Sequence, residues 1–377
     1  MAKKKTRKKE KSQKRRRGWV LWGVVAFLVV GALGSGYLYL TKERLKRRKA
    51  QAAEHYRRGS AYLRRDRYEE AIIAFRKTVM LNPDFAEAYN DMGVVYIKQL
   101  WLPEAERALR TALKIDPEYV EAYSNLGMVY AEQYKFDEAA KIYRAALARR
   151  PYFAALHYNL GRAYSNQGQD EKAIAEYQQA LKLRPRLAQA HYSLGRLYME
   201  QGKVDEAVEK YERAVQLKSD YGDAHYRLGL AYAKQGRYDE AAAEYERTIE
   251  IDSGYARAYY NLGQIYAIQG KAEEGRKMFY LFNEVSKYAK RLDQLKETIA
   301  QDPNNPEGHL KLGLTYAEHG KYREAIRAYT RALQLDSTFV VAYRALGDVY
   351  QDQGMDEKAG AYYRKAVEVY RATQRME

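Results

Sequence analysis

Glycine, tyrosine and alanine recur along most of the chain at the spacing of paired helices. A glycine returns every 34 residues from residue 59 to residue 263, and two more, again 34 residues apart, stand at 313 and 347. A tyrosine follows each glycine by three residues, and in eight of the nine units an alanine follows the tyrosine by nine. Apolar residues at intervals of three and four surround these markers, which indicates helices. The pattern predicts nine units of two antiparallel helices each.

The small residues explain why the two helices of a unit pack closely. In the unit that contains Gly127, glycine on the first helix and Ala139 on the second leave little side chain between the backbones. The rings of Tyr130 and Tyr143 fill the space on either side. A single pair would leave one face bare, and stacking on the next pair buries it, so the units predict a solenoid.

The same unit resembles the tetratricopeptide repeat. The resemblance implies an all-α, right-handed superhelical solenoid whose first helices line a concave groove that holds peptides or partner proteins. We identify about nine repeats, seven in residues 52–285 and two in residues 306–377. The residues that carry the resemblance are Tyr123, Leu126, Gly127, Tyr130, Ala139, Tyr143, Ala146 and Pro151.

The repeat is interrupted between residues 286 and 305. Gly275 replaces the usual alanine, and three aromatic residues, Phe279, Tyr280 and Phe282, follow it. The segment 286–305 has helical periodicity and ends near Pro303, which predicts an irregular extra helix without a partner. We expect a bend there between two rigid blocks, of seven repeats and two.

The N-terminal region predicts a membrane anchor. Residues 1–18 form a basic tail that we expect to be disordered. Residues 19–40 contain no charged residue, and this segment is long enough for one transmembrane helix. Residues 41–51 form a basic juxtamembrane stalk. Cleavage near Ala32-Leu33-Gly34 is an alternative, but the apolar run continues beyond this site, which favours an uncleaved anchor.

Charge predicts how the anchor is oriented. The net charge of +17 arises mainly from 11 Lys and Arg before the apolar segment and six directly after it. The positive-inside rule then favours a cytoplasmic N-terminus in a plasma (inner) membrane and an extracytoplasmic array, with a cytoplasmic array as the alternative. The array itself is nearly neutral, which disfavours a nucleic-acid groove. The absence of cysteine excludes a lipoprotein anchor.

Two rows of the first helices supply the candidate groove residues. Tyrosine offers a flat apolar ring and a hydroxyl, arginine offers charge, and asparagine offers a donor and an acceptor to a peptide backbone. The alternative is that the tyrosines only pack against adjacent helices. The fifth position of each repeat and the sites around it give Tyr158, Tyr192, Tyr226, Tyr260, Arg162 and Arg196, and the sixth position gives Asn125, Asn159 and Asn261.

Five histidines occupy the fourth position of their repeats, where other repeats have tyrosine, so we interpret them as packing residues. We expect no metal and no cofactor. No catalytic motif is present, which indicates that the protein is not an enzyme. At the last repeat we expect Tyr362, Ala366 and Val369 to be partly exposed, which leaves a homo-oligomer open.

The sequence therefore predicts a single-pass, membrane-anchored scaffold that binds protein partners through its groove, in assembly or export of envelope complexes. One alternative is a groove for an extended polysaccharide or peptidoglycan strand. A second is a soluble nucleic-acid protein that uses the basic tail.

Overall fold

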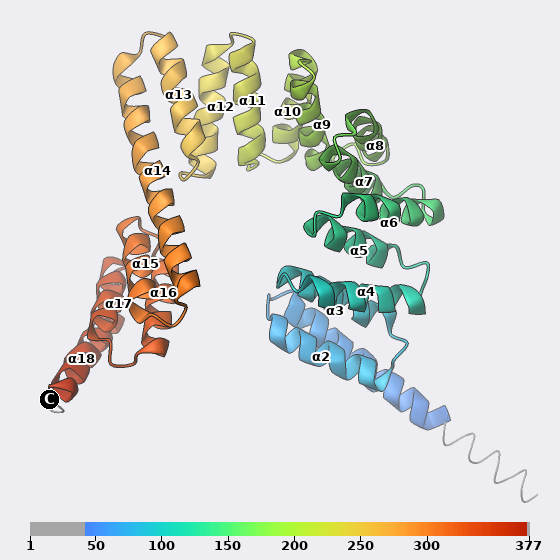
Figure 1. Ribbon diagram of the computed structural model, residues 1–377, viewed down its shortest axis with the longest axis horizontal. Coiled ribbons are helices and arrows are strands. Elements are labelled where there is room, and N and C mark those ends of the chain that lie inside the picture. The colour runs from blue at the N-terminus through green and yellow to red at the C-terminus, as the bar shows by residue number, and fades with distance from the viewer. Residues whose placement is uncertain (1–41, 375–377) are drawn as a thin grey trace, which may run out of the picture. The chain divides into compact units, whose positions relative to one another are not determined.

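The computed structural model describes residues 42–374, and every regular element in this range is an α-helix. The chain divides into two compact units, Met1–Ala190 and His191–Glu377. The boundary lies inside a helix of the fifth repeat. The all-α helical repeat architecture is thus confirmed for the described residues (Figure 1).

In the first unit, helices alternate along the chain. A helix over 42–63 is followed by α2 (Tyr68–Leu81), α3 (Ala86–Lys98), α4 (Leu102–Ile115), α5 (Val120–Glu132), α6 (Phe136–Arg149), α7 (Ala154–Asn166) and α8 (Asp170–Leu183). The helix over 42–63 and the odd-numbered helices are the first helices of their repeats, and are called first-type below. The even-numbered ones are second-type.

The second unit continues the alternation with one exception. Helix α9 (Ala188–Glu200) crosses the boundary, and α10 (Val204–Leu217), α11 (Gly222–Lys234), α12 (Tyr238–Ile251) and α13 (Ala256–Ile268) follow. Then come α14 (Ala272–Gln301), α15 (Pro306–Glu318), α16 (Tyr322–Leu335), α17 (Val340–Asp352) and α18 (Asp356–Thr373). The exception is α14, which has 30 residues where the other second-type helices have 14 to 18.

The recurring glycine forms the close contact that the spacing predicted. A Cβ atom built on Gly161 would lie 2.8 Å from the ring of Tyr177 and 3.2 Å from the carbonyl oxygen of Ala173. Ala173 is fully buried, and the Tyr177 ring is almost so. Small residues therefore allow the two helices of a repeat to approach, and the ring of the second-type helix fills the remaining space.

The segment 286–305 differs from its expected form. Residues 286–301 are not a separate helix but the second half of α14, which continues without interruption from the seventh repeat. No glycine or proline occurs between Arg276 and Asp302, so nothing in the sequence breaks the helix there. In Figure 1, α14 extends from beside α13 to beside α15.

The predicted tail (1–18) and transmembrane segment (19–40) lie outside the described residues. The stalk is described from residue 42, and it is helical without a break into the first repeat. Within the part of the chain that the structure describes, no helix combines the length and the apolar character needed to span a membrane.

Candidate functional site

The candidate site lies on the first-type helices. Helix α5 contacts both α3 and α7 in the first unit, so successive first-type helices lie side by side there. Second-type helices pack behind them, for example α6 against α5 and α7. In the first unit, α3, α5 and α7 therefore present a continuous surface, which carries fifth and sixth positions that were predicted to act.

The fifth-position tyrosines pack against rings of the second-type helices. The centroid of the Tyr158 ring lies 5.7 Å from that of Tyr177 in the first unit. In the second unit, Tyr192 lies between Tyr211 at 5.9 Å and Tyr221 at 5.0 Å. These distances are typical of aromatic packing inside proteins. The rings therefore pack within the array, as the alternative, in which the tyrosines pack against adjacent helices, expected.

Exposure separates the fifth-position tyrosines further. Tyr226 packs between Tyr245 and Tyr255 and is only 8% exposed, whereas Tyr260 is 42% exposed. Tyr158 and Tyr192 are half-buried. These residues therefore do not form an open aromatic stripe along the surface. Tyr260 is the one that a ligand could reach most easily.

The sixth-position asparagines join successive repeats. The side-chain amide of Asn125 donates to the side-chain oxygen of Asn90 over 2.8 Å, and that of Asn159 donates to the hydroxyl of Ser124 over 3.3 Å. In the second unit, Asn261 donates to the Tyr226 hydroxyl over 3.1 Å. Each acceptor belongs to the fifth position of the preceding repeat. One donor of each asparagine is thus used within the protein.

The same contact is made by other residue types where asparagine is absent. Arg227 is hydrogen-bonded to Tyr192, and Asp91 to Tyr56. Burial raises the pKa of the Asp91 carboxyl above its ordinary value of 3.8, and burial together with Asp91 raises the pKa of Tyr56 to about 12. Arg227 and Asp91 were not predicted as site residues, although their place 35 residues after a tyrosine could have indicated them.

The two predicted arginines lie in different settings. Arg196 forms an ion pair with Glu200 at 2.8 Å. Arg162 is exposed and lines a hollow of about 200 Å³ together with Asn159. The two belong to different compact units. Asn159 and Arg162, both of the predicted set, share this hollow.

The hollow lies among α5, α6 and α7. Met128 and Ala131 form part of its apolar lining, and Glu132 and Arg162 contribute opposite charges without forming an ion pair with each other. The ring of Tyr143 forms its base, and burial raises the pKa of this phenol while Arg162 opposes the rise. The exposed ring of Tyr134 stands at the edge. The arrangement offers a cation, an anion, amides and an apolar floor to one extended ligand.

The histidines connect helices within the array. The Nδ1 atom of His157 lies 2.6 Å from the carboxylate of Glu176, and its Nε2 atom lies 2.9 Å from the carbonyl oxygen of Pro151. His225 makes the equivalent contacts with Glu244 and Ser219. His157 and His225 thus each join a first-type helix to the second-type helix of the same repeat. In the range 42–374, no cluster of three or more His, Asp or Glu side chains is arranged to hold a metal ion.

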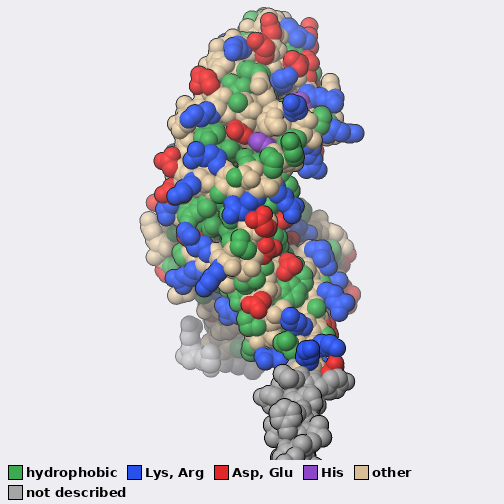
Figure 2. Space-filling view, turned by 90° about the vertical axis from the view of Figure 1, so that its right-hand side faces the viewer, with side chains coloured by type: hydrophobic (Ala, Val, Ile, Leu, Met, Phe, Trp, Pro, Cys, Tyr) green, Lys and Arg blue, Asp and Glu red, His purple; other side chains and the backbone are tan. Residues whose placement is uncertain are grey.

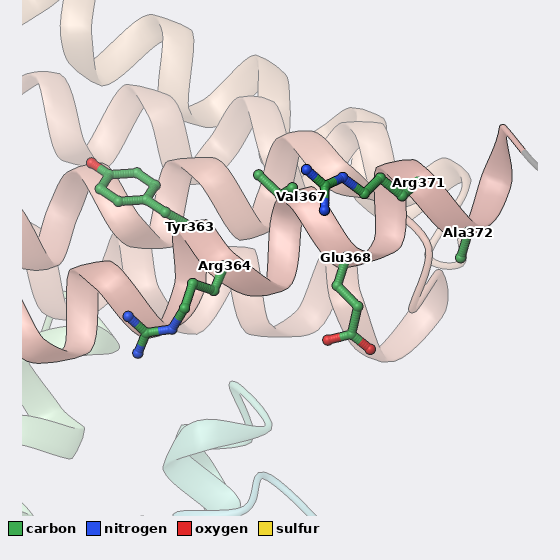
Figure 3. A pocket seen from close by; sticks show the side chains of 6 residues that line it. All are labelled: Tyr363, Arg364, Val367, Glu368, Arg371 and Ala372. Atoms are coloured by element: carbon green, nitrogen blue, oxygen red, sulfur yellow. The ribbon is translucent and has the colours of Figure 1, made fainter.

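Two surfaces complete the description. On the face shown in Figure 2, Lys and Arg side chains lie among Asp and Glu side chains and do not form a separate stripe. A second hollow lies along α18 and is lined by Tyr363, Arg364, Val367, Glu368, Arg371 and Ala372 (Figure 3). All six come from one helix, so this is a shallow surface. Near it, Tyr362 and Val369 are half-buried as expected, but Ala366 is buried.

Family models match almost the whole array. Residues 30–227 match a model described as the C-terminal domain of cilia and flagella-associated protein 70. Models described as TPR or tetratricopeptide repeats match residues 231–270 and 315–354, residues 295–327, and residues 256–285 and 341–373. No curated protein matches the chain.

Several solved structures are similar to parts of the chain. The crystal structure of MamA protein is 31% identical, covers 46% of this chain and 96% of its own, and has a TM-score of 0.42. PilF of Pseudomonas aeruginosa is 22% identical over 51% of this chain and 88% of its own, with a TM-score of 0.48. YrrB, whose structure is described as that of a TPR protein with an unusual peptide-binding site, is 24% identical. It covers 49% of this chain and 95% of its own, with a TM-score of 0.40.

Proposed function

Because the chain belongs to the tetratricopeptide repeat family, we propose that it is a scaffold that holds an extended segment of a partner protein against its first-type helices. The observation that carries the proposal is the hollow among α5, α6 and α7. Arg162 and Glu132 line it without pairing with each other, and Asn159 adds a side-chain amide. A polypeptide offers both the carbonyl oxygens and the amide groups that such a lining binds.

A glycan strand is less well supported. Sugar binding through stacking needs open aromatic faces, and the rings of Tyr158, Tyr192 and Tyr226 pack against other rings. Nucleic acid would require a basic stripe, whereas the face shown in Figure 2 carries mixed charges. A protein partner is therefore the function that the described residues favour.

We also propose that the protein is anchored in the plasma membrane by residues 19–40, with its array on the extracytoplasmic side, where it assists assembly or export of envelope complexes. The support comes from the uncharged segment and from the 11 basic residues before it against six after it.

A photocrosslinking experiment tests the partner-binding surface. Benzoylphenylalanine is introduced at Arg162 on α7, or at Arg144 on the second-type helix α6, in the full-length chain. Both arginines are exposed, so the two sites are matched for access. We expect a protein adduct from position 162 and none from position 144. Equal adducts from both sites, or none from position 162, would contradict the proposed surface.

Topology is tested separately through the absence of native cysteine. Ser253→Cys places a thiol in the exposed turn between α12 and α13. We expect an impermeant maleimide to label it in intact spheroplasts. Labelling only after lysis would place the array in the cytoplasm, and loss of the protein from membranes in carbonate would remove the anchor from the proposal.

A further inference from the structure

Arg227 on α11 is a half-buried cation whose neighbours are phenols. Its guanidinium is hydrogen-bonded to Tyr192, and its charge acts on Tyr211 and Tyr255. Among the described residues, no carboxylate forms an ion pair with Arg227. A charged group that is partly removed from water normally has a partner of opposite charge, because the lost hydration must be replaced. The setting of Arg227 is therefore that of a cation that can take an anion from outside the chain.

Two carboxylates on the same helices have other partners. Glu200 on α9 pairs with Arg196 at 2.8 Å. Asp223 lies one turn before Arg227 on α11 and accepts a hydrogen bond from the Tyr255 hydroxyl over 3.0 Å. Neither carboxylate pairs with Arg227, so neither competes directly for its guanidinium.

The hydroxyl of Tyr211 on α10 is buried and has no hydrogen-bond partner among the described residues. The residue is 0% exposed, and its ring lies 5.9 Å from that of Tyr192. Burial raises the pKa of this phenol while the charge of Arg227 opposes the rise, so the phenol keeps its proton at neutral pH. A buried polar group without a partner costs stability, and in folded proteins such groups normally bind water or a ligand.

The next repeat boundary shows how the same place is closed elsewhere in the second unit. Asn261 on α13 stands 34 residues after Arg227, at the equivalent position. Its side-chain amide donates to the Tyr226 hydroxyl over 3.1 Å, and the asparagine is also hydrogen-bonded to Tyr245. One asparagine thus partners both phenols, whereas Arg227 leaves the hydroxyl of Tyr211 without a partner.

We propose that Arg227, together with the hydroxyls of Tyr192 and Tyr211, binds the carboxylate of an Asp or Glu side chain in the bound partner segment. A guanidinium offers its N–H groups in a fork that matches a carboxylate, and such charge-assisted hydrogen bonds are stronger than neutral ones. Arginine can only donate, so the Tyr192 oxygen accepts from Arg227 and its own proton is left to donate. The Tyr211 hydroxyl supplies a second phenolic donor.

This site rests on the partner-binding function proposed above, and it adds the type of residue that the bound segment carries. It lies in the second unit and shares no residue with the hollow among α5, α6 and α7. First-type helices precede and follow α11 along the chain, so an extended segment on them passes Arg227 with a side chain and does not end there. One guanidinium balances the single charge of a carboxylate, whereas a doubly charged phosphate normally takes several cations.

A peptide array on the purified full-length chain tests the site. Random peptides of about eight residues, which span about 27 Å when extended, are each made in three versions. The first has one internal Glu and an amidated C-terminus, the second has Gln in place of Glu, and the third has Gln with a free C-terminal carboxylate. For the sequences that bind, we expect the Glu version to have a dissociation constant lower than that of the Gln version by about tenfold or more.

Three variants separate the contributions. Arg227→Asn reproduces the arrangement seen at Asn261 and should abolish the preference for Glu over Gln. Tyr211→Phe removes only the unpartnered hydroxyl, so it should not lower the free energy of unfolding, while it reduces the preference by about fivefold. Arg213→Asn is the matched control, because it removes the same charge from an exposed site on the second-type helix α10, and it should leave the preference unchanged.

The outcomes distinguish this site from the proposed function. Equal binding of the Glu and Gln versions, or an undiminished preference in Arg227→Asn, would overturn the carboxylate site, while peptide binding itself would still support the scaffold. Tighter binding of only the version with a free C-terminus would assign the site to a chain end and overturn the side-chain proposal. Absence of binding by every version would count against the site and the proposed function together.

Discussion

Asn125 donates a hydrogen bond from its side-chain amide to the side-chain oxygen of Asn90, 2.8 Å away, across the boundary between the second and third repeats. Asn90 is 5% exposed, so water cannot easily replace the donor. Asn125→Ala should therefore lower the free energy of unfolding by about 1 to 3 kcal/mol, the cost of an unsatisfied buried polar group. Urea denaturation measures it. Glu121→Ala, at an exposed site of the same helix, should have little effect, and equal losses would argue against the inter-repeat contact.

The contact between Gly229 and Tyr245 predicts opposite results for two glycine substitutions. A Cβ atom on Gly229 would lie 2.7 Å from the buried Tyr245 ring, so Gly229→Ala should destabilise the protein by about 1 to 3 kcal/mol. Gly360 lies within α18, where the nearest atom to an added Cβ is a flexible Arg364 nitrogen at 3.4 Å. Gly360→Ala should stabilise by about 0.5 to 1 kcal/mol because alanine favours helix. Thermal unfolding of both variants checks the signs.

Leu100 occupies a left-handed backbone conformation with a φ of 59°. Six equivalent turns later in the chain have glycine there, with φ between 67° and 76°. Leu100 is 72% exposed and gains little from burial, so Leu100→Gly should raise the free energy of unfolding by about 1 kcal/mol. Tyr152→Gly, at an exposed turn residue without a positive φ, should give no such gain. A loss on Leu100→Gly would show that the side chain stabilises the turn.

The Asp91 carboxyl predicts a pH dependence. Burial raises its pKa above the ordinary value of 3.8, so the folded protein holds this proton more tightly than the unfolded chain. The stability that comes from this group is present at low pH and is lost as pH rises from 3.8 through the raised pKa. Asp91→Asn should remove that loss. The free energy of unfolding of the variant should therefore rise relative to that of the wild type between acidic and neutral pH. Unfolding measured across this range checks it; a constant difference would contradict the assignment.

The repeats could be predicted from the sequence because they depend on spacing. Glycine and alanine at fixed intervals place helix against helix, and Gly161 and Ala173 meet as expected. The contacts of Asn125, Asn159 and Asn261 could not be predicted in the same way, because they depend on which direction a side chain takes across a repeat boundary. The tyrosine stripe was overestimated for a related reason: the pattern places Tyr226 on the first-type helix, but only packing decides that two rings cover it.

The uninterrupted course of α14 also has a consequence for cooperativity. In a linear array, unfolding is coupled only between neighbours, and the strength of each boundary decides how far it spreads. Helices α12 and α13 pack side by side at this boundary. Helix α15, in contrast, contacts the second half of α14. We therefore expect helices α15 to α18 to open and exchange their amide hydrogens more readily than the seventh repeat.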